Sequence, residues 1–214
     1  DMLAFAPDGT LAMVDLYGAV ATWRRGEAVQ RRVPPRPSGT VEPLLARDGR
    51  TLYFNEGTHD HLWDLHARQP IAIKRATGER VLAVAPDGRR VVVRTSTGVE
   101  LRNAATGARS YHAPITTGVH VHAHFTPGAH VLLDIQDSKR SLIHVDPQGR
   151  GRPLAIAPGG HSLQLSDDGQ LLAGLDYRGP AKVWRTATGA LAQTLTTNTR
   201  NLTLARDSSA VAWL

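Results

Sequence analysis

Ala6-Pro7-Asp8-Gly9 near the start of the chain returns as Ala85-Pro86-Asp87-Gly88 in its middle. Aspartate bonds back to its own backbone and glycine adopts a positive φ, so Asp-Gly is a strong signal of a tight turn between two strands. Weaker copies of this turn end at residues 49, 128, 169 and 208, so successive copies are 39 to 41 residues apart. Such an even spacing indicates an internal repeat, and this period is typical of arrays and propellers.

Each period contains short apolar runs separated by turns; in the first period they cover 3–5, 11–14, 20–23 and 28–33. No stretch longer than a few residues has helical periodicity, so the sequence predicts an all-β chain of antiparallel four-stranded units. Four strands at this period fit one blade of a β-propeller. We expect blades at 1–39, 40–79, 80–118, 119–160 and 161–200, with a partial sixth at 201–214. In the fourth period only three strands are visible, followed by a turn at Pro147-Gln148-Gly149.

Several of these pieces resemble the WD40 repeat family. Phe5-Ala6-Pro7-Asp8-Gly9 is similar to its first turn, Leu62-Trp63-Asp64 and Val183-Trp184-Arg185 to its third strand, and the Thr-Gly pairs at 106–107 and 188–189 to the turn that follows. Gly160-His161, with Trp184 downstream, is similar to the Gly-His…Trp-Asp frame of the family. The resemblance covers the whole chain and implies a propeller without chemistry of its own, which binds a protein or peptide as a scaffold or sensor.

The chain also departs from the family pattern at the tryptophan position. Only Trp63-Asp64 is a complete Trp-Asp pair, because Trp23 and Trp184 are followed by arginine. We place Arg102 and His144 at the tryptophan position of the third and fourth repeats. The buried His–Asp network that the resemblance implies is therefore incomplete in most blades.

Five blades and two strands do not close a ring, so we expect this chain to be part of a larger propeller, seven-bladed as is common in the resembling family. The chain begins at Asp1 within a strand pattern. We therefore expect a longer protein. The resemblance to similar bacterial repeats implies a multidomain chain in which the propeller is a sensor joined to effector domains. The alanine- and arginine-rich composition indicates a bacterial source, and we expect a cytoplasmic location.

Composition limits the functional classes. Lysine and arginine exceed aspartate and glutamate by 25 to 19, which favours acidic partners in a general way. Aromatic residues make up only 5%, too few for the stacking platforms of single-stranded nucleic-acid binding. The absence of cysteine excludes disulfides and thiolate metal sites. No apolar run approaches the roughly 18 residues of a membrane span.

Loops on a rigid scaffold are where binding residues collect, so we expect partner binding at the first turns and at the turns after the third strands. The candidate residues there are Arg24, Arg25, His61, Arg102 and Arg185. His59-Asp60-His61 stands where a hairpin turn is expected, and we interpret it as a solvated turn in which the aspartate caps the backbone.

His120, His122 and His124 alternate along one expected strand and so point to one face. Two imidazoles at this spacing could share a zinc or copper ion, with other ligands coming from another blade. The alternative is a polar lining of the channel or a contact between blades. A metal-dependent propeller enzyme of the lactonase or dehydrogenase kind is the second functional hypothesis, and these histidines are its only support.

A third hypothesis is a nucleic-acid-associated platform that uses the basic edge formed by Arg24, Arg25, Arg31, Arg32 and Arg36. Without a recognised binding motif such an edge is only an electrostatic footprint, so we disfavour this partner. Pro34-Pro35-Arg36-Pro37 predicts a stiff linker, although an aromatic groove could bind its Pro-x-x-Pro spacing.

Catalytic signatures are not visible in the sequence. It contains no nucleophile elbow, no phosphate-binding glycine loop and no His-Glu-x-x-His motif. Asp15, Asp134 and Asp176 fall near the ends of second strands and are interpreted as turn residues. The first hypothesis is therefore a non-catalytic module that binds a protein or peptide and needs no cofactor.

Overall fold

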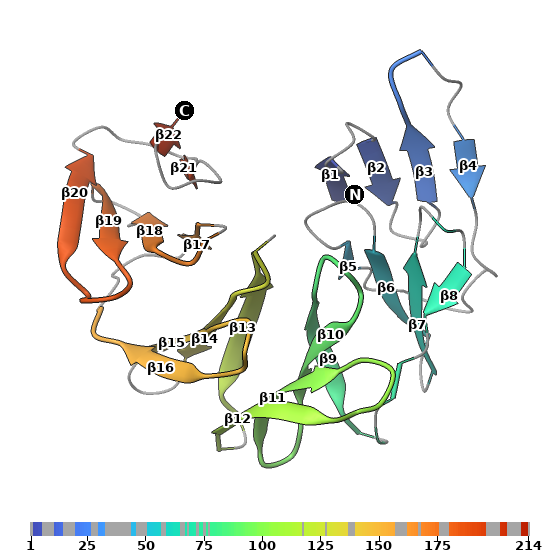
Figure 1. Cartoon of the computed structure of the whole chain (residues 1–214), viewed down its shortest axis with the longest axis horizontal. Coiled ribbons are helices and arrows are strands. Elements are labelled where there is room, and N and C mark those ends of the chain that lie inside the picture. Colours follow the sequence, from blue (N-terminus) through green and yellow to red (C-terminus); the bar gives the residue numbers. More distant parts are fainter. Residues whose placement is uncertain are drawn as a thin grey trace. The chain divides into compact units, whose positions relative to one another are not determined.

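Every secondary-structure element among the described residues of the computed structural model is a β-strand (Figure 1). The structure describes residues 2–5, 11–14, 20–26, 30–32, 44–45, 51–56, 59–64, 67, 69–71, 73–74, 76, 78–116, 118–126, 128–136, 140–156, 162–166, 168–175, 180–195, 202–204 and 211–213. The chain divides into two compact units, Asp1–Thr117 and Gly118–Leu214. No helix among the described residues could cross a membrane.

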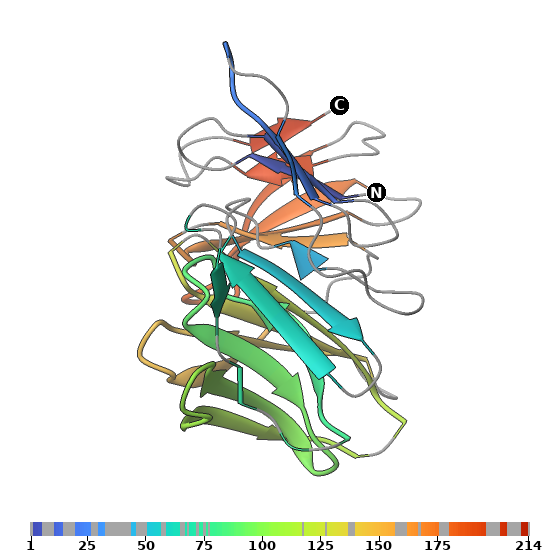
Figure 2. The ribbon, with the colours of Figure 1, turned by 90° about the vertical axis from the view of Figure 1, so that its right-hand side faces the viewer.

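The first unit contains three four-stranded sheets, in each of which every strand pairs antiparallel with the next. The first sheet consists of β1 (Met2–Phe5), β2 (Leu11–Val14), β3 (Val20–Trp23) and β4 (Gln30–Arg32). The second consists of β5 (Leu44–Leu45), β6 (Thr51–Glu56), β7 (His59–Asp64) and β8 (Gln69–Ile71). The third consists of β9 (Arg80–Val84), β10 (Arg90–Arg94), β11 (Gly98–Asn103) and β12 (Arg109–Pro114), and its strands show the usual twist in Figure 2.

The second unit repeats the plan with two four-stranded sheets and one strand pair. The fourth sheet consists of β13 (His120–Phe125), β14 (Val131–Gln136), β15 (Ser141–Val145) and β16 (Gly151–Leu154). The fifth consists of β17 (Ser162–Leu165), β18 (Leu171–Leu175), β19 (Ala181–Arg185) and β20 (Leu191–Leu195). The strand pair consists of β21 (Leu202–Leu204) and β22 (Val211–Trp213). This confirms the predicted all-β propeller fold with four-stranded antiparallel blades.

Two local expectations differ from the structure. His59-Asp60-His61 is not a turn, because β7 begins at His59 and pairs this residue with Glu56 of β6. The fourth sheet has a fourth strand, β16, which the sequence hides because Pro153 interrupts its pattern. Pro153 occupies the outermost strand of its sheet, where a residue without an N–H is tolerated.

The sheets pack face to face through alternate residues of their strands. In the first unit, Tyr53 and Leu62 of the second sheet form a buried cluster with Val81, Val91 and Val93 of the third. Thr51 supports this contact, since its hydroxyl donates to the carbonyl oxygen of Pro86 in the first turn of the third sheet, at 3.0 Å. The second and third sheets therefore bury apolar faces against each other, as a repeat architecture requires.

The second unit is built in the same way. Leu132, Leu142 and Leu154 of the fourth sheet are in one buried cluster with Leu165 and Leu172 of the fifth. Trp184 packs against this cluster from β19.

Gly169 shows how tightly the first turn of the fifth sheet approaches the fourth sheet. Its φ is +69°, and a Cβ there would lie 2.6 Å from Nδ1 of His130 and 2.8 Å from Nε2 of His144. At Gly118, with φ +87°, a Cβ would have no atom of the described residues within 4 Å, apart from those of Gly118 itself and its chain neighbours.

Replacing Gly169 with alanine is therefore expected to destabilise the protein more than replacing Gly118 with alanine. Both variants carry the backbone cost of a positive φ, about 1 kcal/mol, but only Gly169→Ala must also push the two sheets apart, which costs roughly 1–3 kcal/mol more. Urea denaturation of the two variants measures the difference. Equal free energies of unfolding would contradict this packing.

The hydrogen-bond register identifies equivalent positions in the five blades. In each blade, the last residue of the first strand pairs with a residue of the second strand, which in turn pairs with one residue of the third. That third-strand residue is Trp23, Trp63, Arg102, Val145 or Trp184. The prediction for Arg102 is confirmed. The prediction for His144 is wrong, because buried Val145 occupies the tryptophan position and His144 lies on the opposite face of β15.

Candidate interaction site

The turns that follow the third strands, here called third turns, differ among the blades in their first residue. In three blades this residue accepts a hydrogen bond from a backbone N–H within the turn. Asp64 accepts from Ala67, Asn103 from Thr106, and Asp146 from Gln148, each at 2.9 Å. A side-chain oxygen at this position thus stabilises the turn, as Asx turns do.

In the first and fifth blades this position holds Arg24 and Arg185, which cannot accept such a bond. The fifth turn closes without it, through backbone bonds between Arg185 and residues 189 and 190 and through Thr188, whose hydroxyl accepts from the N–H of Ala190 at 3.2 Å. Both arginines are exposed. Their guanidinium groups are therefore not required for the local fold and are presented to solvent.

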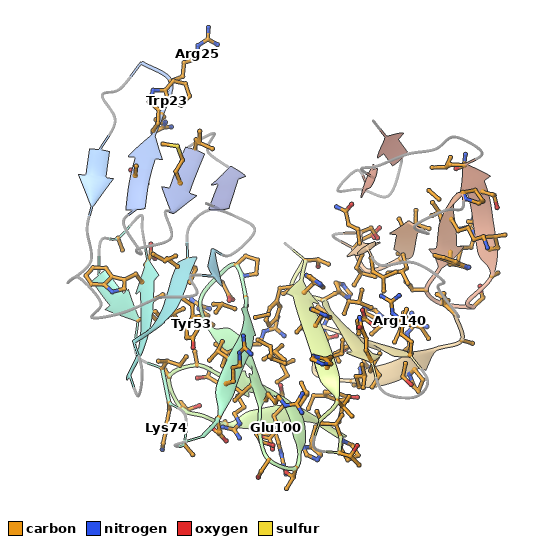
Figure 3. The ribbon with its side chains drawn as sticks, turned by 180° about the vertical axis from the view of Figure 1, so that it is seen from behind. Trp23, Arg25, Tyr53, Lys74, Glu100 and Arg140 are labelled. Atoms are coloured by element: carbon orange, nitrogen blue, oxygen red, sulfur yellow. The ribbon has the colours of Figure 1, made fainter. Side chains whose placement is uncertain are left out.

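The strands that flank these two turns each carry an exposed large apolar side chain. Trp23, directly before Arg24, is 38% exposed, and Leu191, on the strand after Arg185, is 53% exposed; no other large apolar side chain among the described residues is exposed. Arg25 is also exposed, and Figure 3 shows Trp23 and Arg25 at the end of β3, with Arg25 pointing away from the sheet. Tryptophan and arginine are the residues most enriched where proteins bind one another.

Arg102 is placed differently from these arginines. Its Nη1 and Nη2 atoms donate to both carboxylate oxygens of Glu79, at 2.8 and 2.7 Å, and its Nε donates to Glu100 at 2.6 Å. Arg109 and His112 approach the other oxygen of Glu100, at 3.2 and 3.4 Å. Arg102 is thus the centre of a partly buried ion-pair cluster within the third blade.

The carboxylates of this cluster are held ionised. Burial alone would raise the pKa of Glu79 and of Glu100, but the hydrogen bonds and charge of Arg102 outweigh it and lower both values. The same carboxylates raise the pKa of Arg102. Arg102 therefore connects β11 to the segment before β9, in which Glu79 lies.

The three alternating histidines share one face of β13, as predicted: His120, His122 and His124 are exposed, whereas Ala123 and Phe125 between and beyond them are buried. His122 pairs across the sheet with Asp134. That carboxylate accepts from Nε and Nη2 of Arg140, at 2.8 and 2.7 Å, and from Gln136. Among the described residues, no group of three or more His, Asp or Glu side chains is placed to hold a metal ion.

Asp134 is an internal ion-pair residue rather than a turn residue, because it is 4% exposed within β14. Burial raises the pKa of Asp134, but Arg140 and Gln136 outweigh this effect, so its pKa lies below the usual value. Asp15, Asp176, Arg36 and the Pro34-Pro35-Arg36-Pro37 segment lie outside the described residues. His61 lies in β7, and Arg31 and Arg32 in β4, but the positions of these side chains are not described.

The sequence did not reveal two features of the structure. One is the exposure of Trp23 and Leu191, two large apolar side chains on the strands that flank the third turns of the first and fifth blades. The other is a contact between His130 and His144, whose ring nitrogens Nδ1 and Nε2 are 2.9 Å apart. No spacing rule predicts it, since His130 lies in a turn and His144 in a strand.

Comparison with known proteins supports the fold. No protein-family model matches the chain, and no curated protein matches it. Among solved structures, the chain is similar to the β-propeller domain of Cps50 (Swd1) from Myceliophteria thermophila, with a TM-score of 0.61 and 14% sequence identity. The similarity covers 94% of this chain and 74% of that one. At this identity the likeness shows the propeller fold alone.

Proposed function

We propose that this chain, a β-propeller of the WD40 type, is a non-catalytic module that binds a protein or peptide partner. The observation that carries the proposal is the replacement of the turn-stabilising residue by exposed arginine in the first and fifth blades, Arg24 and Arg185. An arginine that the turn does not need is available to a carboxylate or phosphate, which its planar fork can bind with two parallel hydrogen bonds.

The chemistry of these turns favours an acidic partner segment that also carries an apolar side chain. Arg24 and Arg25 directly follow exposed Trp23 in the chain, and exposed Leu191 begins the strand after the turn that Arg185 opens. An acidic residue would pair with guanidinium, and a neighbouring aliphatic or aromatic side chain would cover the exposed apolar surface. The net charge of +6 adds a general attraction for such a segment.

The role of scaffold or sensor in a longer, multidomain protein is part of the same proposal. Its support is the fold, since a propeller presents short loops on a rigid frame. Fold alone does not determine function, so the proposal is tested by peptide binding to variants of the third turns.

Fluorescence anisotropy with labelled 12-residue peptides tests the proposal. The probes are an Asp/Glu-rich peptide with a central leucine and phenylalanine, and its Lys/Arg-rich and Ser/Gly-rich counterparts. We expect the acidic peptide to bind most tightly. Arg24→Glu and Arg185→Glu should each weaken its binding by about tenfold, because each removes a charge-assisted hydrogen bond and adds repulsion.

Arg89→Glu provides the matched control. Arg89 is exposed and undergoes the same change of charge, but it lies in a first turn of the third sheet. Equal weakening by Arg89→Glu would mean that net charge or the first turns contribute as much as Arg24 and Arg185, and would contradict a site made by the third turns alone. A preference for nucleic acid that falls steeply with salt would instead support the basic-platform hypothesis.

A further inference from the structure

The outer edge of the fifth sheet is more exposed than the outer edges of the two sheets before it. β20 is the outermost of the four strands of this sheet and pairs on one side with β19 (Figure 1). Its residues 191–194 are all exposed, whereas in the outer strands β12 and β16 exposed residues are mixed with half-buried and buried ones. β20 therefore presents both of its faces to solvent along most of its length.

The amino acids of β20 also differ from those of the other outer strands. Proteins protect the edge of a sheet against pairing with another chain by placing charged residues or proline in the outer strand. The outer strands of the other four-stranded sheets each contain arginine or proline: Arg31 and Arg32 in β4, Pro70 in β8, Arg109 and Pro114 in β12, and Arg152 and Pro153 in β16. Leu191-Ala192-Gln193-Thr194-Leu195 contains neither a charge nor a proline.

The backbone N–H of Leu191 points to this edge. The N–H of Arg185 in β19 donates to the carbonyl oxygen of Ala190 at 2.9 Å, so this carbonyl group points toward β19. The N–H of Leu191 belongs to the same peptide unit, and the C=O and N–H groups of a trans peptide unit point in opposite directions. The N–H of Leu191 therefore points away from β19, to the side on which a further strand would lie.

A row of apolar side chains crosses the fifth sheet and ends at the same residue. Leu172 of β18 lies opposite Trp184 of β19, and Trp184 lies opposite Leu191 of β20. Exposure increases along this row, because Leu172 is fully buried, Trp184 is half-buried and Leu191 is 53% exposed. An apolar residue of a further strand, placed opposite Leu191, would continue the row and remove Leu191 from water.

Arg185 lies on the opposite face of the sheet from this row, since successive side chains of a strand point to opposite faces. It is exposed, and Ala190, with which its backbone N–H is bonded, has a short side chain that leaves the guanidinium accessible. The residue that follows or precedes the one opposite Leu191 would lie on the face of Arg185. An acidic side chain there would complement the charge of Arg185.

We propose that β20 is a docking edge, to which an extended acidic and apolar segment of the partner adds as a fifth strand. In this mode the main-chain hydrogen bonds contribute affinity, and side chains on alternate faces contribute specificity. The segment places an apolar residue opposite Leu191 and an acidic residue beside it, facing Arg185. The inference rests on the peptide-binding function proposed above and states how the fifth blade holds the same partner.

Charge favours this occupant over a second copy of the chain. The net charge of +6 attracts an acidic segment, whereas two copies paired through β20 would bring like charges and two Arg185 residues together. The register of β20 with β19 shifts once, between Val183 and Trp184, and such irregularities twist a strand locally. The docked segment therefore pairs over no more than the five residues of β20.

Two 12-residue peptides of identical composition test the predicted alternation by fluorescence anisotropy. In one, glutamate and leucine alternate through the central positions; in the other, the same residues stand in separate blocks. We expect the alternating peptide to bind about fivefold more tightly, because only its sequence places leucine and glutamate on opposite faces of one strand. Equal affinities would contradict the strand geometry.

Methylation of single backbone nitrogens in the alternating peptide tests the main-chain bonds directly, on the wild-type chain. A strand beside β20 directs the N–H groups of every second residue toward it. Methylation should therefore weaken binding about fivefold at alternate central positions and much less at the positions between them. Uniform effects, or none, would overturn the proposal.

Leu191→Pro and Leu191→Ala separate the backbone of β20 from its side chain. Both variants lose the leucine side chain, but only proline also removes the N–H that points to the edge, and it leaves the bond between Arg185 and Ala190 in place. We expect Leu191→Pro to bind the alternating peptide about fivefold more weakly than Leu191→Ala does. Equal affinities of the two variants, with circular dichroism showing that both are folded, would contradict pairing at β20.

The outcomes distinguish this inference from the function on which it rests. Binding that is weakened by Arg185→Glu, but not by N-methylation or by Leu191→Pro, would retain the third-turn site and refute strand addition. Absence of binding by any acidic peptide would refute both. Analytical ultracentrifugation of the chain alone gives the remaining test, since a dimer that Leu191→Pro abolishes would assign the edge to a second copy and overturn the proposed occupant.

Discussion

Replacing Arg102 with alanine should lower the free energy of unfolding by about 3 kcal/mol, because it removes the centre of a partly buried ion-pair cluster. The side chains of Arg102, Glu79 and Glu100 are only 15%, 12% and 9% exposed. Removal of the guanidinium leaves two adjacent carboxylates in a poorly solvated position, and repulsion between them adds to the cost.

Urea denaturation at pH 7, followed by circular dichroism, measures this effect. Arg109→Ala is the matched control, since Arg109 pairs with the same Glu100 but is 57% exposed, and its loss should cost about 0.5 kcal/mol or less. Similar losses for the two variants would contradict the central position of Arg102. Glu79→Gln combined with Arg102→Ala should cost less than the sum of the single changes, because the two residues share one interaction.

The pH dependence of this variant follows from the same cluster. The pKa values of Glu79 and Glu100 in the folded protein lie below the ordinary glutamate value of 4.5, so the carboxylates stabilise the wild-type protein above pH 4.5. This stabilisation is lost as the pH falls through the folded values. Arg102→Ala removes the largest of the effects that lower the two pKa values, while the N–H of Ala76 and the charge of Arg109 remain, and should therefore lose less stability on acidification than the wild type.

Replacing Leu172 with alanine should cost about 3 kcal/mol, because the change opens a cavity where the fourth and fifth sheets meet. Leu172 is fully buried, in the same cluster as Leu132, Leu142 and Leu165. The neighbouring sheet cannot close the space easily, since Gly169 and the histidine pair already hold the backbones at contact distance.

Leu191→Ala removes the same atoms from a residue that is 53% exposed and should change the free energy of unfolding by less than about 0.5 kcal/mol. Urea denaturation followed by tryptophan fluorescence compares the two variants. In Leu172→Ala the emission of Trp184, which packs against the cluster, should also shift to longer wavelength. Equal effects of the two substitutions would show that the cluster does not hold the two sheets together.

Much of the fold follows from local signals in the sequence. The turn at Ala85-Pro86-Asp87-Gly88 lies between β9 and β10, and Gly88 has the positive φ that its position predicts. The alternation of His120, His122 and His124 correctly predicted a shared face. The turn and the shared face each depend on residues that are close together in the sequence. The repeat period, the alternation of a strand and the chemistry of Asp-Gly turns are therefore enough to predict them.

The candidate sites depend on contacts that the sequence cannot show. Arg102 was predicted as a binding residue, but its main partner, Glu79, is 23 residues away, and the bidentate pair exists only because the chain turns back on itself. Arg24 and Arg185 are arginines like Arg102, but they are exposed because of the path that the backbone takes through the third turns. A side chain that serves the fold and one that is available to a partner look alike in the sequence.

The spacing between paired strands has a consequence for how this chain is compared with others. Six residues separate the paired ends of the first two strands in the second, third and fifth blades, but only five separate Phe5 from Leu11 and Phe125 from Val131. An alignment of the five repeats therefore needs a one-position gap in these two turns. The paired residues of the second and third strands, Val131 and Val145, are 14 positions apart in the fourth blade but 11 or 12 apart in the others, so two or three inserted positions are also needed there. Without them, Leu142 or Ile143 is matched to the tryptophans in place of Val145, and the residues compared are not structural equivalents.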